Sequence, residues 1–216
     1  MKMKKLTKGI FITFEGPEGC GKTTQSHLLC DYLRRFYACV YTREPGGTAL
    51  GERIRRVLLN SKDIEISDMA ELFLFEACRA EIVEEVIKPS LARGKIVICD
   101  RFSDATFAYQ GYGAKLPLVA IRALDRIATR ALKPDLTILL DVETLTGLRR
   151  AKRKGVDRME RKNAAYHRRV RLGYLKLARR EPKRMKVIKT TDTIDDTQKV
   201  VRQEVGRVIR GYKGAR

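Results

Sequence analysis

Apolar residues follow two alternating patterns along the chain. Five short apolar runs have the length and composition of buried strands, and they lie at residues 10–14, 39–42, 96–99, 136–140 and 185–188. Between them, apolar residues recur at helical spacing, in segments 21–36, 49–59, 68–91, 116–132, 145–154, 163–180 and 195–210. Strands that are apolar throughout and alternate with helices predict an α/β fold, with a five-stranded parallel sheet and helices on both faces.

The segment 68–91 contains signals for where its helix begins and ends. Asp68, with Glu71 three residues later, is typical of a helix start with reciprocal capping, and Pro89 predicts a bend or a stop. The chain has no internal repeat, low-complexity tract or Pro/Gly/Ser linker. Its 216 residues therefore suit one domain, and an apolar content of 44% suits a packed core.

The apolar runs are too short for a membrane segment. None approaches the ~20 residues that span a bilayer, and the basic start, residues 1–8, is followed only by the run 10–14. We therefore expect a cytoplasmic protein. The five cysteines are scattered without a CxxC pair, which favours passive thiols over a metal site or a disulfide framework; they are Cys20, Cys30, Cys39, Cys78 and Cys99.

Positive charge is concentrated in the last third of the chain. Residues 1–141 have a net charge of +4 and residues 142–216 a net charge of +16, which together give +20. Such a basic region suits either nucleic-acid binding or an enzyme whose substrates are both polyanions. Charge alone does not separate these two classes.

The sharpest chemical signal follows the first predicted strand. It reads Gly16-Pro17-Glu18-Gly19-Cys20-Gly21-Lys22-Thr23 and matches the phosphate-binding pattern G-x-x-x-x-G-K-[ST]. The glycines allow backbone N–H groups to surround phosphate oxygens, and the following helix start adds a favourable partial charge. We expect these eight residues to bind ATP, with Lys22 at the β- and γ-phosphates and the Thr23 hydroxyl on Mg²⁺.

A second acidic residue is expected to help hold the magnesium. Asp100 and Asp141 each follow a predicted strand. We favour Asp100, because Arg101 and a hydroxyl-rich stretch follow it at the edge of the sheet where ligands bind in such folds.

The phosphate-binding loop alone does not separate kinases from other P-loop proteins. The guanine-reading pattern N-K-x-D of GTPases does not occur, and motors or helicases usually need a longer chain. Arg43, Arg79 and Arg101 each lie in a segment that suits the lining of a cleft, as phosphoryl transfer to a small acceptor requires. A nucleic-acid-binding P-loop ATPase that uses the basic last third of the chain remains an alternative. Aromatic residues on which bases could stack are sparse in that region.

Several segments, in order and at suitable spacing, resemble the thymidylate kinase family. They are residues 14–25, 42–48, 72–79, 100–110, 133–136 and 157–160. The segment Arg43-Glu44-Pro45-Gly46-Gly47-Thr48 is far more specific than the phosphate-binding loop. The resemblance covers about residues 9–188 and implies a P-loop NTPase fold, phosphorylation of dTMP to dTDP with ATP and Mg²⁺, and a homodimer. The alternative within this class is a kinase acting on another nucleoside monophosphate or on a deoxynucleoside.

The resemblance also implies roles for individual residues. Phe75 would stack on thymine and Arg79 would donate to a base carbonyl, while Thr106, Tyr109 and Gln110 would complete the pocket. Arg43 and Arg101 would hold the acceptor's 5′-phosphate, and Glu18 would meet the sugar 3′-OH. The Glu44-Pro45 bond resembles one that is cis in the family.

The resemblance finally suggests a lid. One branch of the family has an arginine at the position of Gly19, whereas the bacterial-type branch has glycine there and supplies the arginine from a mobile lid. Gly19 and the basic segment from Arg149 to Arg158 fit the bacterial-type branch. We expect a lid at about residues 149–160, with Arg153 and Arg158 as the leading candidates for a catalytic arginine.

Overall fold

Five parallel strands form the central sheet, in the order β2-β3-β1-β4-β5. The computed structural model describes residues 6–60, 64–152, 157–191 and 193–214. The strands are β1 (Ile10–Glu15), β2 (Cys39–Arg43), β3 (Ile96–Asp100), β4 (Leu136–Asp141) and β5 (Met185–Lys189). The predicted α/β fold with a five-stranded parallel sheet is confirmed.

Each strand extends one residue beyond the apolar run that predicted it. The added residue is ionisable in every case, and the five are Glu15, Arg43, Asp100, Asp141 and Lys189. Apolar patterning records which side chains are buried, whereas the strand itself ends where its ladder of backbone hydrogen bonds ends. The carboxyl edge of the sheet therefore gathers charged side chains that the apolar runs did not include.

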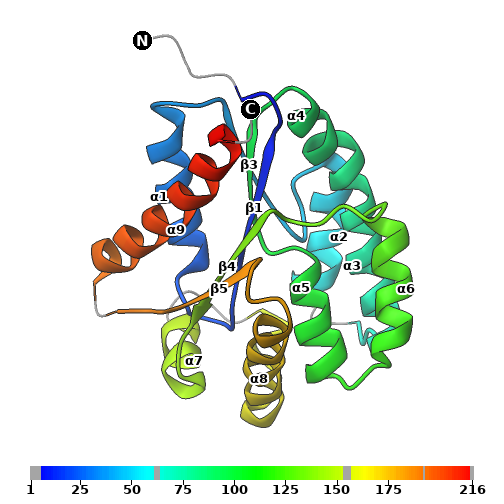
Figure 1. Cartoon of the computed structure of the whole chain (residues 1–216). Helices are drawn as coiled ribbons and strands as arrows, with labels where there is room; N and C mark the ends of the chain where they lie inside the picture. The colour runs from blue at the N-terminus through cyan, green and yellow to red at the C-terminus, as the bar shows by residue number, and fades with distance from the viewer. Residues whose placement is uncertain (1–5, 61–63, 153–156, 192, 215–216) are drawn as a thin grey trace.

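Helices cover both faces of the sheet (Figure 1). On one face, α1 (Lys22–Arg34) packs against α9 (Ile194–Gly214). The other face carries α2 (Ala49–Asn60), α3 (Asp68–Ile82), α4 (Lys88–Ala92), α5 (Ser103–Thr106) and α6 (Leu118–Ala128). Two further helices, α7 (Thr144–Lys152) and α8 (Ala164–Arg180), lie towards the carboxyl ends of the strands. No described helix has the length and apolarity needed to cross a membrane.

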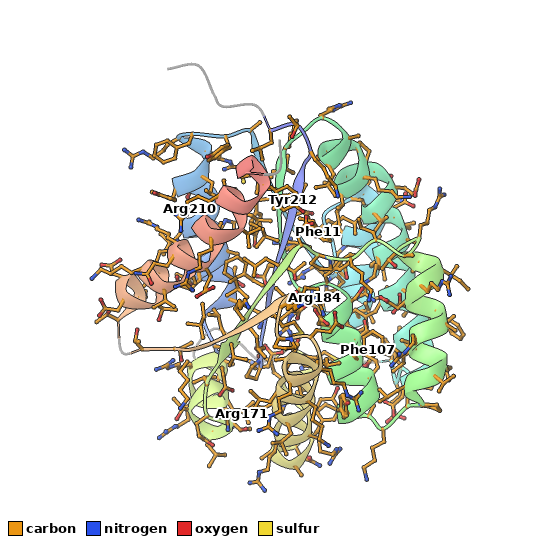
Figure 2. The ribbon with its side chains drawn as sticks, in the orientation of Figure 1. Phe11, Phe107, Arg171, Arg184, Arg210 and Tyr212 are labelled. Atoms are coloured by element: carbon orange, nitrogen blue, oxygen red, sulfur yellow. The ribbon has the colours of Figure 1, made fainter. Side chains whose placement is uncertain are left out.

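The core lies on both faces of β1, whose six residues are all buried. Ile10, Ile12 and Phe14 join the cluster beneath α1 and α9, whereas Phe11 packs on the opposite face with Phe102. At the amino end of the sheet, Asp135 accepts hydrogen bonds from the backbone N–H of Phe11 and from the hydroxyl of Tyr212 at the end of α9, and the labelled Phe11 and Tyr212 lie close together there (Figure 2).

The helix expected over 68–91 is interrupted before the proline. A π-helical turn, Val83–Ile87, separates α3 from α4, and Pro89 lies in the first turn of α4. Pro89 has no N–H to donate, and its ring excludes the ordinary helical turn before it.

The expected reciprocal capping at the start of α3 is wrong. The Ser67 hydroxyl caps the helix by accepting a hydrogen bond from the backbone N–H of Ala70. The Glu71 carboxylate instead accepts hydrogen bonds from Gln110 and Arg158.

Residues 103–113 form a helical segment that the sequence pattern does not predict. It begins with α5 and continues as the π-helical stretch Phe107–Gly113. Two of its buried positions, Thr106 and Gln110, are polar because they line a cavity, so the segment lacks the apolar periodicity of a core helix.

The phosphate-binding loop touches α7 through two glycines. Gly19 has φ +66°, and a Cβ there would lie 2.0 Å from the Gly147 carbonyl oxygen. A Cβ on Gly147 would in turn lie 2.3 Å from the Glu18 carbonyl oxygen. The backbones therefore approach so closely that neither position accommodates a side chain without movement of the loop or of α7.

We expect Gly19→Ala to destabilise the protein by about 2 kcal/mol, because the methyl group meets backbone and the conformation is left-handed. Gly211→Ala is the matched control, since its methyl group would meet no neighbouring segment of the described chain within 4 Å and alanine favours a helix. Urea denaturation of both variants measures the difference. Equal midpoints for Gly19→Ala and the wild type would contradict the close packing.

Candidate active site

The phosphate-binding loop joins the end of β1 to the start of α1. Gly21 has a left-handed conformation with φ 86°, and Lys22 and Thr23 open the helix. The Lys22 ammonium group is buried, 3.3 Å from the Pro17 carbonyl oxygen and 3.9 Å from the Glu18 carboxylate. The first N–H groups of a helix have no partner within the helix, so together with the buried Lys22 cation they make this loop suited to a bound anion.

Two cavities meet at this loop. The first has a volume of about 340 Å³ and extends over β2, β3, α3 and the 103–113 segment. The second, of about 460 Å³, lies between the loop, α7 and the start of α9. Both are lined by Glu18, Lys22, Thr23 and Glu160. The arrangement offers two compartments that open onto one cationic side chain.

Asp100 and Thr23 form an oxygen-rich corner of the first cavity. The Thr23 hydroxyl donates to Asp100 Oδ2 at 2.5 Å, while Asp100 Oδ1 is buried and has no hydrogen-bond partner within the described part of the chain. Asp141, the other sequence candidate, is bound by Arg171 at 2.7 and 2.9 Å. Asp100 thus retains an oxygen for a hard cation such as Mg²⁺, and Asp141 is already paired.

No cluster of three metal-ligating side chains occurs among the residues that the structure describes. Mg²⁺ is usually held by one or two carboxylates together with water and substrate phosphates. The hydroxyl of Thr23 and the free oxygen of Asp100 are donors of the type that Mg²⁺ prefers.

Glu18 and Arg101 form the charged centre between the cavities. Arg101 Nη2 donates to Glu18 Oε1 at 2.7 Å, and the Tyr109 hydroxyl donates to the same oxygen at 2.6 Å. Burial opposes ionisation of Glu18, but the positive charges of Arg101 and Lys22 outweigh it and lower its pKa to about 2. Glu18 is therefore a carboxylate at neutral pH and acts as a hydrogen-bond acceptor.

Two residues that the sequence analysis gave no role in the site, Glu15 and Tyr174, hold Arg101 in place. The Arg101 backbone is left-handed, with φ 69°, and the next residue, Phe102, donates its backbone N–H to Glu15 Oε1 at 2.7 Å. The Tyr174 hydroxyl donates to Glu15 Oε2 at 2.8 Å and lies 3.4 Å from Arg101 Nη1. Burial, reinforced by the charge of Asp104, raises the pKa of Glu15 to about 8.

The far end of the first cavity combines an aromatic ring with polar groups. Phe75, Arg79, Thr106 and Gln110, which the sequence analysis assigned to a base pocket, all line this cavity. Thr106 Oγ1 is buried without a hydrogen-bond partner within the described residues, which leaves it free for a ligand.

Arg79 is more constrained than its predicted role suggested. Its Nε and Nη2 donate to Glu44 Oε2 at 3.0 and 2.8 Å, and Nη1 donates to Glu76 at 2.7 Å. Burial raises the pKa of Glu44 to about 7 against the opposing effect of Arg79. The Glu44-Pro45 peptide bond is cis, as the resemblance implied.

The remaining phosphate-binding candidate, Arg43, lies at the mouth of the first cavity. It is exposed and pairs with Glu52 at 3.1 Å. Arg55, which the sequence analysis did not single out, lines the same cavity and donates to the Pro45 carbonyl at 2.7 Å. Arg55 lies within α2, and no sequence motif around it indicates a binding site.

The structure distributes the lid arginines among different places. Arg150 lines the second cavity, and Arg153 lies outside the described residues. Arg158 is not among the residues that line either cavity; its guanidinium binds Glu71 and the Leu58 carbonyl. Asp157 and Glu160, its near neighbours, line the first cavity.

Known proteins are similar to this chain in sequence and in fold. The model of the family described as thymidylate kinase matches residues 14–201. A thymidylate kinase of Symbiobacterium thermophilum is 45% identical over 208 residues, covering 95% of this chain and 97% of that protein. One of Synechococcus sp. is 52% identical over 177 residues, covering 82% and 84% respectively.

A solved structure gives the same result in three dimensions. The crystal structure of thymidylate kinase from Ehrlichia chaffeensis superposes with a TM-score of 0.75 at 37% identity, covering 92% of this chain and 99% of that one. Agreement of this extent in sequence and in fold leads to one conclusion: the chain belongs to the thymidylate kinase family.

Proposed function

We propose that this protein transfers the γ-phosphoryl group of ATP to dTMP, which yields ADP and dTDP. The observation that carries the proposal is the meeting of two cavities at Glu18, Lys22 and Thr23, in a chain of the thymidylate kinase family. The second cavity would hold ATP and the first dTMP. In-line transfer requires two phosphate groups to meet at one electropositive point, which Lys22 supplies.

The donor phosphates would bind the backbone N–H groups of residues 16–23, and Lys22 would neutralise charge on the migrating group. Thr23 and Asp100 would hold Mg²⁺, which supplies further charge neutralisation when bound to the nucleotide. The unpaired Oδ1 of Asp100 supports this assignment.

The acceptor would lie with its phosphate near Arg43 and Arg101 and its base towards Phe75. Glu18 is ionised and supported by Arg101 and Tyr109, so it suits an acceptor role at the sugar 3′-OH. Phe75 offers a ring for stacking on a planar base.

Arg79 and its neighbours would read the base. Three of the five Arg79 N–H groups bind Glu44 and Glu76, which fixes the guanidinium and leaves N–H groups for a carbonyl oxygen. An arginine donor suits the O4 carbonyl of thymine and not the amino group of cytosine. Thr106, Tyr109 and Gln110 would enclose the base and sugar.

The lid would supply an arginine to the migrating phosphoryl group, because Gly19 leaves the loop without one. Arg153 remains a candidate, and Arg150 joins it because it lines the second cavity. Arg158 would have to leave Glu71 to take this part.

Internal bonds account for part of the positive charge of the last third. Arg171 binds Asp141, Arg184 binds Asp104, and Arg169 donates to the Gly113 carbonyl; the first two are labelled in Figure 2. Charges used inside the fold are not available as a nucleic-acid surface, which favours the kinase over the nucleic-acid-binding alternative. We also propose that the enzyme is cytoplasmic.

A homodimer would use the outer faces of α2 and α3. These packed helices expose four large apolar side chains, Leu50, Val57, Met69 and Phe73. Burial of such a surface between two copies is favourable because it removes apolar area from water. A monomeric mass by light scattering at micromolar concentration would refute the dimer.

The first test compares kcat/KM for dTMP, dCMP, dGMP and dAMP with ATP and Mg²⁺, in the absence of nucleic acid. We expect dTMP to be preferred by at least tenfold, and excess chelator to abolish transfer until Mg²⁺ is restored. Equal or greater activity on another monophosphate would replace the base assignment, and ATP hydrolysis that requires nucleic acid would replace the kinase.

The second test replaces each arginine of residues 149–158 singly with alanine, with Lys22→Ala as the reference for lost transfer. A transition-state arginine should lower kcat by more than about tenfold, or about 1.4 kcal/mol, with little change in KM for ATP. If no single change reaches that size, the segment serves only to attract substrates.

A further inference from the structure

Glu71 is a buried carboxylate that binds a residue of the first cavity on one side and Arg158, at the described end of the expected lid, on the other. It lies on α3 with 1% of its surface exposed. Its Oε1 accepts a hydrogen bond from Gln110 Nε2 at 2.7 Å, and Gln110 lines the first cavity. Its Oε2 accepts from Nη2 of Arg158 at 2.5 Å. One side chain therefore joins two parts of the site that are far apart in the sequence.

Arg158 fixes the described end of the expected lid, residues 157–160, to α2 as well as to α3. Its Nε donates to the Leu58 carbonyl at 2.7 Å, and its backbone N–H donates to the Leu59 carbonyl at 3.2 Å. The residues on either side of it, Asp157 and Met159, line the first cavity. A single arginine thus holds this wall of the cavity against the helices that carry the base pocket.

Burial makes the Glu71–Arg158 pair costly to open. The carboxylate is 1% exposed and the guanidinium 13% exposed, so separation of the two leaves a charge with little access to water. A second ion pair, Asp68–Lys162, connects the same helix to the same region of the chain. It spans 3.7 Å, and its side chains are 44% and 35% exposed, so solvent screens it.

The hydrogen bond to Glu71 also sets the orientation of the Gln110 amide. Because the carboxylate accepts from Nε2, the amide nitrogen is directed to Glu71 and the carbonyl oxygen is the group that remains for a ligand. A ligand that forms a hydrogen bond with the Gln110 amide therefore changes the environment of the Glu71 carboxylate, which also binds Arg158.

We propose that Glu71 is a positioning residue that couples the base end of the acceptor cavity to the lid through Gln110 and Arg158. The inference rests on the proposed function, because it takes the first cavity as the site of the nucleoside monophosphate. Glu71 touches neither substrate. It aligns the amide that would meet the base and anchors residues 157–160, so acceptor binding and the position of these residues change together.

The test uses Glu71→Gln, which keeps the shape and removes the charge. We expect KM for dTMP to rise about tenfold or more, and KM for ATP to stay within about twofold, because the second cavity does not contact Glu71. A purely structural role would instead lower the melting temperature without this separation of the two constants. Asp68→Asn is the matched control and should leave both constants within about twofold.

Trypsin gives a readout that does not depend on turnover. Arg149, Arg150 and Lys152 are exposed cleavage sites at the start of the lid. Saturating dTMP should slow cleavage there in the wild type and in Asp68→Asn, but not in Glu71→Gln. Loss of protection at a saturating concentration reports lost coupling and not weak binding.

Glu71→Gln/Arg158→Gln covers the case in which Glu71→Gln fails to fold, because it also removes the unpaired buried cation. Its KM for dTMP should be raised, yet no higher than that of Arg158→Gln alone, since both changes break one linkage. A folded Glu71 variant, single or double, with KM for dTMP within twofold of the wild type and with protection retained overturns the coupling. A wild-type protein that phosphorylates none of the four monophosphates refutes the proposed function, and this inference with it.

Discussion

The parallel ladder of backbone hydrogen bonds in the central sheet is the constraint on which the site depends. β1 pairs with β3 on one side and β4 on the other, and the register places Phe14 beside Asp100 and Glu15 beside Leu139. Because all strands run the same way, their carboxyl ends meet at one edge of the sheet. The ladder therefore brings residues from distant parts of the chain to the phosphate-binding loop, and the apolar faces of the sheet keep them there.

Buried ionic groups determine how that edge is organised. Each of the carboxylates Glu18, Glu44 and Glu71 lies against an arginine, because an unpaired charge in the interior would be strongly destabilising. The pairs also fix side-chain direction. Arg79 cannot turn away from the first cavity while Glu44 and Glu76 hold it. The ion pairs therefore contribute to the site mainly because they orient its side chains, and less because they stabilise the folded protein.

Local sequence rules fail where the site begins. The 103–113 segment is helical although its buried positions include the polar residues Asp104, Thr106 and Gln110. The Glu71 carboxylate binds Gln110 and Arg158 although it stands where a capping residue belongs. Both deviations have one cause, since a cavity for polar ligands needs polar side chains in positions that a core helix would fill with apolar ones. Thr106 and Gln110 line the first cavity, and Glu71 lies behind that wall, where it binds Gln110.

The sequence by itself determined the five strands and, apart from the 103–113 segment, the helices in their order along the chain, together with the phosphate-binding loop. The residues that it assigned to a base pocket line one cavity. These follow from short-range patterns, because hydrophobic period and glycine spacing reflect local geometry, and from segments that resemble a known family. It did not determine that Asp100 keeps a free oxygen while Asp141 is paired, that Glu15 and Tyr174 hold Arg101, or that Arg158 binds Glu71. Only the tertiary structure decided these, because ion pairs and buried hydrogen bonds join residues 30 to 159 positions apart, and no local pattern records which partner a charged side chain meets.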